Sequence, residues 1–226
     1  MSISYHLREL EFALDQGDEH RTIPGVLDTD REILDIGCGI GQTLVALHTG
    51  AHRVGVDVDM EAIRYGSEHF PDLRLLVAKG DSIPFPDEVF DLVYSRVSLP
   101  YMNIPRVVRE VRRVLRPGGR FWMTMHTREH VRQFMAARRS VRASLYYGYV
   151  VLNGYLFKHV GVLVPLGHRY ESWQDEPTMC RLLTRHGFTA RLLDIGGRTA
   201  IEATKPGQLC GSTSSSSSAE GSLPLR

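Results

Sequence analysis

The chain has 226 residues, of which 27 are basic and 26 acidic, and its formal net charge is +1. This length allows one sizeable domain with additions, and a hydrophobic content of 42% is typical of a water-soluble globular protein. No apolar run is long enough for a membrane span, and the N-terminus lacks the apolar core of a secretory signal, so we expect a cytoplasmic protein. The three cysteines are scattered, which favours reduced thiols and indicates no metal site.

Hydrophobic periodicity in the first 126 residues predicts helices and strands in alternation. Leu7, Leu10 and Leu14 can share one face of a helix over residues 5–16. The strands that follow are too apolar to have one face in water, which favours a parallel sheet covered by helices on both sides. The predicted strands cover residues 31–37, 52–59, 73–81, 89–97 and 120–126, and the helices between them cover 41–50, 60–70 and 104–119.

Residues 128–172 depart from this alternation of strands and helices. The stretch 128–147 is predicted to form a basic amphipathic helix. The overlapping stretch 146–165 is aromatic and apolar, but glycines, Asn153 and Lys158 interrupt it, which makes it a poor membrane span. It fits a cap helix or the wall of an apolar pocket instead.

The α/β pattern resumes after residue 172. We expect a helix over residues 175–188, ended by Gly187, and then two strands over 189–197 and 198–206 that pair antiparallel at a sheet edge. The Ser-rich C-terminal stretch cannot bury a core, which predicts disorder. The expected organisation is an N-terminal helix or lid (1–28), a ligand-binding core (29–127), a helical cap or substrate insertion (128–172), a closing helix and strands (173–206) and a disordered tail (207–226).

Charge is distributed unevenly along the chain. Residues 1–95 hold 18 acids and 7 bases, whereas residues 96–147 hold 12 arginines and 2 acids. The simplest interpretation is that basic helix faces are solvated or lie near acidic surfaces; the alternative is attraction of an anionic substrate, a membrane surface or a nucleic acid. No aromatic interleaving or known nucleic-acid module accompanies these arginines, so we expect no DNA partner and regard RNA as the weaker alternative.

The stretch "DIGCGIG" leaves the first predicted strand and opens the next helix, where a parallel sheet binds its ligands. A phosphate loop would need a lysine after Gly41, but Gln42 stands there, and a dinucleotide loop would need its third glycine at that same position. The spacing of Asp35, Gly37, Gly39 and Gly41 instead fits a ligand with an ammonium group beside a carboxylate. The carboxylate could be held by the loop amides and the helix N-terminus.

Two further acidic residues follow the next strands. Asp57 ends the second predicted strand, where a carboxylate can accept hydrogen bonds from both hydroxyls of an adenosine ribose. Asp59 is predicted to cap the next helix. Asp81 follows the third strand and can accept from an adenine amino group, while the backbone N–H of Ser82 or Ile83 can reach a ring nitrogen.

The order "ILDIGCGIG", "VGVDVD", "GDSIPFPDEVFDLVYS" and "EVRRVLRPGGRFWM" resembles the class I S-adenosylmethionine-dependent methyltransferases, most of all the group with ubiquinone/menaquinone-type and many small-molecule enzymes. The resemblance covers about residues 30–126 and the closing helix and strands. It implies a Rossmann-like, doubly wound, seven-stranded α/β sheet whose last strand is antiparallel, and S-adenosylmethionine as cofactor. The implied cofactor-binding residues are Asp35, Gly37, Cys38, Gly39, Gly41, Asp57, Val58, Asp81, Ser82 and Ser95.

The sequence carries few candidates for catalysis. Many relatives have a histidine where this chain has Pro100, which removes one candidate base. Tyr101 is expected beside the mouth of the active site, and His126 follows the fifth strand, where it could act as a base, contact the substrate or be a structural hydrogen-bonder. Tyr5 and His6 precede the first helix, which by the resemblance could lie over the cofactor, and ordinary packing of a lid is the favoured interpretation for them.

We expect a methyl transfer by in-line displacement to a small, apolar or aromatic molecule, because residues 146–155 are rich in tyrosine. The same residues could form a self-contained helix pair or a dimer interface, and both a monomer and a homodimer stay open. The alternatives are an RNA or protein methyltransferase that uses the arginine-rich middle region, and a non-catalytic cofactor-binding relative. The arginines concerned are Arg132, Arg138, Arg139 and Arg142.

Overall fold

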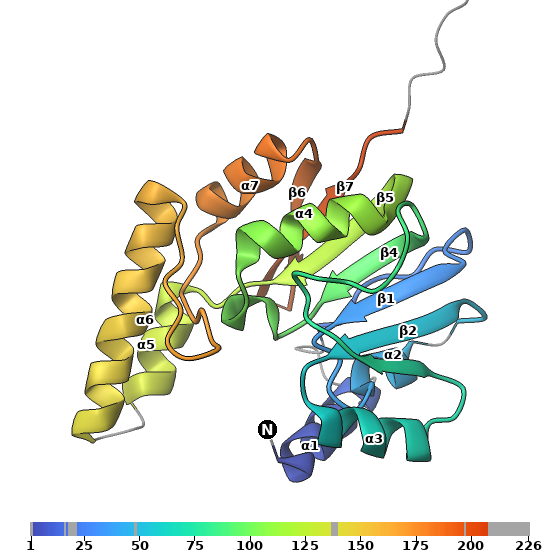
Figure 1. Ribbon diagram of the computed structural model, residues 1–226, viewed down its shortest axis with the longest axis horizontal. Coiled ribbons are helices and arrows are strands. Elements are labelled where there is room, and N and C mark those ends of the chain that lie inside the picture. Colours follow the sequence, from blue (N-terminus) through green and yellow to red (C-terminus); the bar gives the residue numbers. More distant parts are fainter. Residues whose placement is uncertain are drawn as a thin grey trace, which may run out of the picture.

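The computed structural model describes residues 2–15, 17, 22–47, 49–136, 140–196 and 198–207. It contains one seven-stranded sheet in the order β3-β2-β1-β4-β5-β7-β6, with helices packed on both of its faces (Figure 1). The strands are β1 (Glu32–Ile36), β2 (His52–Asp57), β3 (Arg74–Val77), β4 (Phe90–Ser95), β5 (Leu115–Thr124), β6 (Thr189–Ile195) and β7 (Arg198–Thr204).

Seven α-helices and one 3-10 turn accompany the strands within the described residues. Strands β1 to β5 pair in parallel with one another, whereas β7 runs antiparallel to both β5 and β6. The predicted Rossmann-like sheet with an antiparallel last strand is therefore confirmed. The helices are α1 (Ile3–Leu14), α2 (Gln42–Ala46), α3 (Met60–His69), η1 (Leu99–Tyr101), α4 (Ile104–Val114), α5 (Arg128–Ala136), α6 (Val141–Val160) and α7 (Glu176–Arg185).

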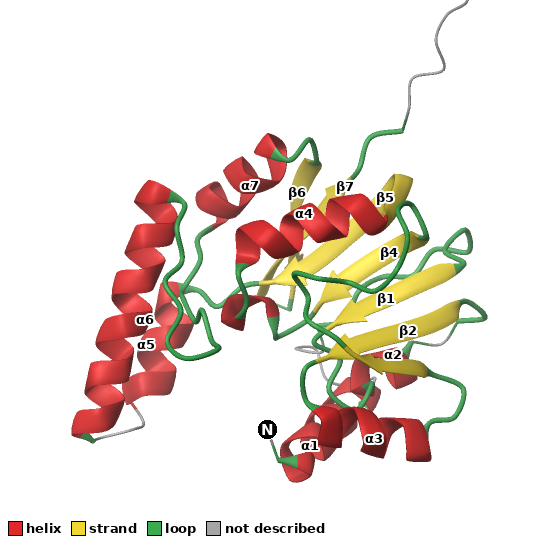
Figure 2. Ribbon diagram, viewed as in Figure 1, coloured by secondary structure: helices red, strands yellow, loops and turns green. Residues whose placement is uncertain are grey.

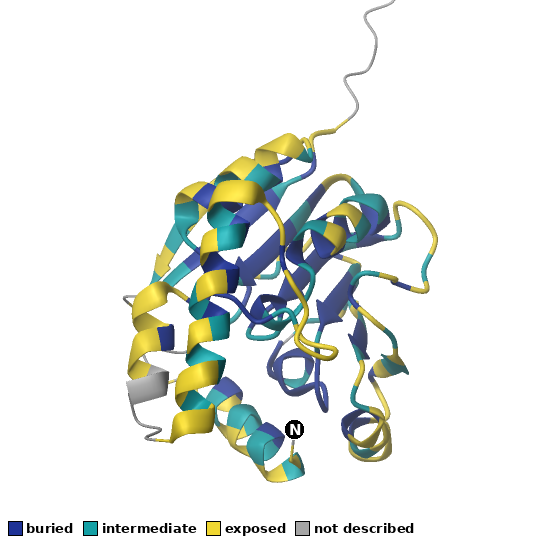
Figure 3. Cartoon of the chain, turned by 60° about the vertical axis from the view of Figure 1, so that its left-hand side comes forward, coloured by how far each residue is buried: buried dark blue, intermediate teal, exposed yellow. Residues whose placement is uncertain are grey.

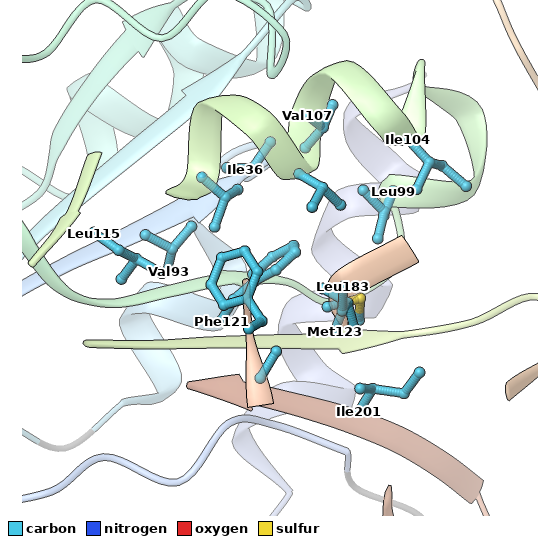
Figure 4. Packing of buried hydrophobic residues seen from close by; sticks show 14 of the residues in the cluster. Ile36, Val93, Leu99, Ile104, Val107, Leu115, Phe121, Met123, Leu183 and Ile201 are labelled. Carbon is cyan, nitrogen blue, oxygen red and sulfur yellow. The ribbon is translucent and has the colours of Figure 1, made fainter. Parts of the chain in front are cut away.

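The core between α4 and the sheet explains why the central strands are continuously apolar. Helix α4 turns Val107, Val111 and Val114 inward, each fully buried. They pack in one cluster with Phe121 and Met123 of β5 (Figure 4). The burial of each large side chain contributes about 1.5–3 kcal/mol to stability. This cluster therefore holds in place the strand ends that carry the polar residues.

The end of α4 differs from the sequence prediction. The stretch 104–119 was expected to be a helix closed by Pro117, Gly118 and Gly119, but the helix ends earlier, at Val114, and β5 begins directly at Leu115. Pro117 has no N–H and disfavours helical backbone at Arg116, so the chain is already extended there. Gly118 has a φ of 83°, and the register of β4 against β5 shifts nearby.

Residues 128–172 form two helices with different boundaries from those predicted. Helix α5 ends at Ala136, and α6 starts after Ser140, whose hydroxyl accepts a hydrogen bond from the Ala143 amide at 3.1 Å. Arg138, Arg139 and the tail from residue 208 onward lie outside the described residues, so the predictions made for them stay predictions.

Helix α6 contains the residues that interrupt the apolar stretch of the sequence. Gly154 leaves room for the Trp173 ring, since a Cβ there would lie 2.2 Å from the indole nitrogen. The Asn153 amide donates to the carbonyls of Tyr170 and Glu171 at 2.9 and 3.0 Å and accepts from the Val164 N–H. These contacts bind the segment after α6 back along the helix, so the interruptions serve packing. No helix in the described parts of the chain is both long and apolar enough to cross a membrane.

Candidate functional site

The glycine loop of residues 37–41 leaves the carboxyl end of β1 and leads into α2. Strand β1 lies between β2 and β4 in the sheet, so the winding of the chain reverses at this point. The carboxyl ends of β1, β2 and β4 face the same edge (Figure 2). Open α/β sheets bind ligands at such a reversal, as the sequence predicted for this loop.

The backbone of the loop requires glycine at three positions. Gly37, Gly39 and Gly41 have φ values of 77°, 55° and 87°, which lie in the left-handed region. A Cβ at Gly37 would also lie 1.9 Å from the Ser98 hydroxyl, and one at Gly41 would lie 2.7 Å from Leu73. The loop is thus packed closely from two sides, and substitution would displace it.

The amides of the loop are already engaged, which corrects one expectation. Gly37 and Cys38 donate to the Val56 carbonyl at 2.7 and 3.1 Å, and Gly41 donates to the Cys38 carbonyl at 2.9 Å. The amides of Gly39 and Ile40 donate to the side chains of Asp57 and Gln42. In this arrangement the loop amides offer no free donor to a ligand carboxylate, because neighbouring strands and side chains use them to hold the loop.

Asp57 lies at the carboxyl end of β2, as predicted, and its side chain forms a hydrogen bond with the glycine loop. Its Oδ2 accepts from the Gly39 N–H at 2.8 Å, and its Oδ1 accepts from the Asp59 N–H at 2.9 Å. Each carboxylate oxygen keeps a further lone pair, so the group can still accept from two ribose hydroxyls. Asp59 caps α3 by accepting from the amides of Glu61 and Ala62, as expected.

Asp35 is buried in β1, and its Oδ1 has no hydrogen-bond partner among the described residues. Burial raises the pKa of its carboxyl to about 8, although Arg96 and Tyr94 nearby act to lower that pKa. A buried carboxyl with an orphaned oxygen is costly unless something pairs with it. A ligand ammonium group would supply such a partner.

Of the residues predicted to contact adenine, Asp81 remains available to a ligand, whereas the amides of Ser82 and Ile83 do not. Asp81 is half-buried, and no described group donates to its carboxylate, which leaves it able to accept. The two candidate donors are occupied, since the Ser82 N–H binds the Lys79 carbonyl and the Ile83 N–H binds the Glu110 carboxylate. The expectation that one of these amides reaches a ring nitrogen is therefore not met in this arrangement.

Three other residues predicted to bind the cofactor differ in how far their side chains are exposed. The Cys38 side chain is buried in the core beside Gly55, so that only its backbone faces the loop. Ser95 is fully buried, and its hydroxyl donates to the Ile36 carbonyl at 2.9 Å, behind the loop. Val58 is exposed next to Asp57, where an aromatic base could cover it.

Helix α1 supplies two contacts that the sequence interpretation did not assign. His6 is buried against the loop, because a Cβ at Gly39 would lie 2.4 Å from its Nδ1. Neither ring nitrogen of His6 has a partner among the described residues, and burial lowers its pKa. Glu9 of the same helix forms an ion pair with the buried Arg96, whose guanidinium also lies over the Phe12 ring at 5.8 Å. No local pattern reveals these contacts, since they depend on where α1 packs.

The two residues predicted for catalysis are neighbours in the structure. The rings of Tyr101 and His126 meet edge to face with centroids 5.4 Å apart, and His130 stacks on His126 at 4.9 Å. Burial, with a smaller contribution from His130, lowers the pKa of His126 to about 4. His126 is therefore neutral at pH 7 and able to accept a proton. Met102, next to Tyr101, lies against the loop at Gly37.

Residues 34–123 match the family model described as a methyltransferase domain. The chain contains a methyltransferase domain. It is 36% identical over 96 residues to a sterol 4-C-methyltransferase of Caenorhabditis elegans, a match that covers 39% of this chain and 29% of the relative. It is 28% identical over 138 residues to a malonyl-[acyl-carrier protein] O-methyltransferase of a Marinomonas species, which covers 50% and 51%. The chain thus matches about half or less of the length of these relatives.

A solved S-adenosylmethionine-dependent methyltransferase of Thermotoga maritima shares the fold of this chain. The TM-score is 0.59 at 17% identity, and the likeness covers 90% of this chain and 96% of that one. The methyltransferase domain is thereby of the class I type with a Rossmann-like sheet. The methyl donor of such a domain is S-adenosylmethionine.

The residues present fit this cofactor. The orphaned Oδ1 of Asp35 suits the ammonium group, and the unpartnered ring of His6 can donate to the carboxylate beside it. Asp57 retains acceptor capacity for the ribose, and Asp81 for the adenine amino group. S-adenosylmethionine supplies a methyl group on a sulfonium, so that the departing thioether is neutral and needs no proton.

A surface hollow of about 530 Å³ lies near the start of β4 and β5, away from the glycine loop, and Asp87, Arg113 and Lys205 line part of it. Two pairs of these charges neutralise each other, since Arg113 pairs with Asp87 at 2.9 Å and Lys205 pairs with Glu88 at 3.1 Å. Within the described part of the chain no cluster of three metal-binding side chains occurs.

Proposed function

We propose that the protein transfers the methyl group of S-adenosylmethionine to a small, apolar or aromatic molecule by in-line displacement. The observation that carries this proposal is the Tyr101–His126 ring pair, which adjoins Met102 and hence the glycine loop at Gly37. An aromatic wall next to the methyl donor suits an apolar acceptor. The similarity to a sterol 4-C-methyltransferase supports the same class of acceptor.

The residues of the site have distinct roles in this proposal. Asp35, His6 and Asp57 bind and orient the cofactor, because alignment of the acceptor with the methyl group, at about 3 Å, is the main catalytic requirement. Tyr101 positions the acceptor. His126, neutral at pH 7, takes a proton from an acceptor that must lose one.

An alternative is a methyltransferase that acts on RNA or on a protein-borne group. The similarity to an enzyme that modifies malonyl-[acyl-carrier protein] supports a carrier-bound acceptor. Arg132, one of the arginines concerned, is paired with Glu129 at 2.8 Å, which reduces the charge it can offer to RNA. Strong salt dependence of RNA binding would favour the RNA alternative.

A ligand comparison tests the cofactor assignment. S-adenosylhomocysteine at a hundredfold excess over its Kd should raise the melting temperature by roughly 5–10 °C, since such binding adds about 2.7 kcal/mol to stability. NAD should leave the melting temperature unchanged, because Gln42 occupies the third glycine position of a dinucleotide loop. A shift with NAD and none with S-adenosylhomocysteine would refute the assignment.

Replacement of His126 by alanine tests the proposed base. With phenolic acceptors and labelled cofactor, kcat should fall by roughly 10²- to 10⁴-fold, while the affinity for S-adenosylhomocysteine stays the same. In the wild type the acidic limb of the pH profile should lie well below pH 6.5, because the pKa of His126 is about 4. His130→Ala is the matched control and should have a smaller effect. An unchanged kcat in His126→Ala would exclude a base at this position.

A further inference from the structure

Helix α6 is apolar on two opposite faces. One face is buried and consists of Val150, Asn153, Gly154 and Phe157. A helix that is apolar all round normally lies inside a protein or against lipid. In this structure the aliphatic side chains of the second face are exposed.

The uncovered face is a continuous stripe along α6. Val141, Leu145 and Leu152 are 79%, 74% and 59% exposed, and Tyr155 continues the same line. Spacings of four, seven and three residues place these side chains on one side of a helix. From Val141 to Tyr155 the stripe extends over about 21 Å, at 1.5 Å per residue. Figure 3 shows exposed residues along the outward side of α6.

The last residue of α6 and the segment after the helix widen this surface. Val160, Val162, Val164 and Leu166 are exposed, while Leu163 between them is buried. The Tyr149 hydroxyl donates to the Val164 carbonyl at 2.9 Å, which places this segment along the flank of the helix. We call the exposed apolar residues of α6 and this segment the outer patch. Its members are Val141, Leu145, Leu152, Tyr155, Val160, Val162, Val164 and Leu166.

Exposed cations border the outer patch. The Arg128 guanidinium lies 5.6 Å from the centroid of the Tyr155 ring, and Arg142 and Arg169 are exposed beside the stripe and the segment. None of these three has an ion-pair partner in the described parts of the chain. The nearby Glu171 is buried and bonded to the Tyr146 hydroxyl, so it offers no surface charge.

The aliphatic stripe and the bordering arginines together indicate which kind of partner could cover the outer patch. A second copy of the chain, packed symmetrically on α6, would bring the same arginines close to their own counterparts, which like-charge repulsion disfavours. Single-stranded RNA would need aromatic side chains on which bases stack, whereas the exposed residues are mainly valine and leucine. An anionic lipid surface matches both the aliphatic stripe and the cations at its border.

We propose that the outer patch docks the protein onto an anionic lipid bilayer, with α6 lying in the plane of the interface. The aliphatic side chains enter the boundary between headgroups and acyl chains, and Arg128, Arg142 and Arg169 contact lipid phosphates. The docking is peripheral and reversible. It rests on the outer patch and the arginines at its border, and does not depend on which molecule accepts the methyl group.

Vesicle co-sedimentation tests the proposal with the full chain. The wild type should bind vesicles of phosphatidylglycerol and phosphatidylcholine at low salt, and bind pure phosphatidylcholine vesicles at least tenfold more weakly. The double variant Leu145→Glu/Leu152→Glu should lose at least tenfold in partitioning, and Arg142→Glu should lose severalfold. The exposed Leu192 of β6, replaced by glutamate, is the matched control and should bind like the wild type.

Folding and self-association are measured on the same proteins. Each variant should keep the melting temperature of the wild type and its shift with S-adenosylhomocysteine, because the altered side chains face solvent. Equal binding of wild type and double variant, or equal binding to neutral and anionic vesicles, would overturn the proposal. So would a wild-type dimer that the double variant dissociates, if neither protein binds vesicles.

Discussion

Replacement of Asp57 by alanine is expected to weaken the binding of S-adenosylhomocysteine by roughly 10²- to 10⁴-fold. The carboxylate is the proposed acceptor for the ribose hydroxyls, and hydrogen bonds to a charged group contribute about 1.5–3 kcal/mol each. The same side chain also holds the Gly39 amide at 2.8 Å, so its removal frees the loop as well. Titration calorimetry at pH 7.5 measures the affinity directly.

The neighbouring Asp59 provides the control for this variant. Its carboxylate caps α3 and has no assigned ligand, so Asp59→Ala should cost about 1 kcal/mol of stability and leave the affinity within a few-fold of wild type. Asp57→Asn should fall between wild type and alanine, because the amide oxygen can still accept from Gly39. A folded Asp57→Ala protein with wild-type affinity would show that the ribose assignment is wrong.

The second large effect is expected for Asp35→Asn, which should raise the stability of the cofactor-free protein and weaken the binding of the cofactor. The pKa of its carboxyl is about 8 in the folded protein, mainly because it is buried, against about 3.9 in an unfolded chain. Between these values the folded state holds a proton that the unfolded state has lost. The free energy of unfolding of the cofactor-free protein should therefore fall as the pH rises from about 4 to 8.

The Asp35→Asn variant should remove this pH dependence. A shift of about four units corresponds to at most ~5 kcal/mol at pH 8, so the variant should be more stable than wild type there and similar to it near pH 4. Denaturant unfolding at several pH values measures the difference. Equal slopes of stability against pH in both proteins would contradict the pKa assigned to Asp35.

The same variant should bind the cofactor less well. An ammonium group beside Asp35 favours its ionised form, so binding of S-adenosylhomocysteine at pH 7 should release a proton in the wild type and none from this position in Asp35→Asn. Calorimetry in buffers of different ionisation enthalpy counts that proton. If both proteins release the same number, the ammonium group lies elsewhere.

Much of the fold and of the cofactor site follows from local sequence patterns. Continuous apolar strands alternate with helices because a parallel sheet is covered on both faces, and that pattern predicted the sheet and its antiparallel end. The three glycines and Asp57 were placed from spacing alone, because their positions depend only on the end of a strand and the start of a helix. Asp59 as a helix cap is of the same kind.

Other features depend on contacts between residues far apart in the chain, and these only the tertiary structure decided. The predicted helix over residues 128–147 ends early because Ser140 caps a new helix, and that helix tolerates Gly154 because Trp173 fills the space. His6 reaches the loop only through the packing of α1, and the loop amides are occupied only because Val56 and Asp57 lie beside them.

Sequence periodicity by itself determined that the chain would form a parallel sheet covered by helices, with a glycine loop and an acidic strand end, since each of these needs only local residue spacing. The seven-stranded Rossmann-like topology was implied by the family resemblance. The tertiary structure decided which polar groups remain free for a ligand and which apolar faces remain uncovered. Both α6 faces are apolar in sequence, and only the packing of α6 shows that Val150 and Phe157 are buried while Leu145 and Leu152 face solvent. The physical reason is that burial and hydrogen-bond satisfaction are properties of neighbours in space.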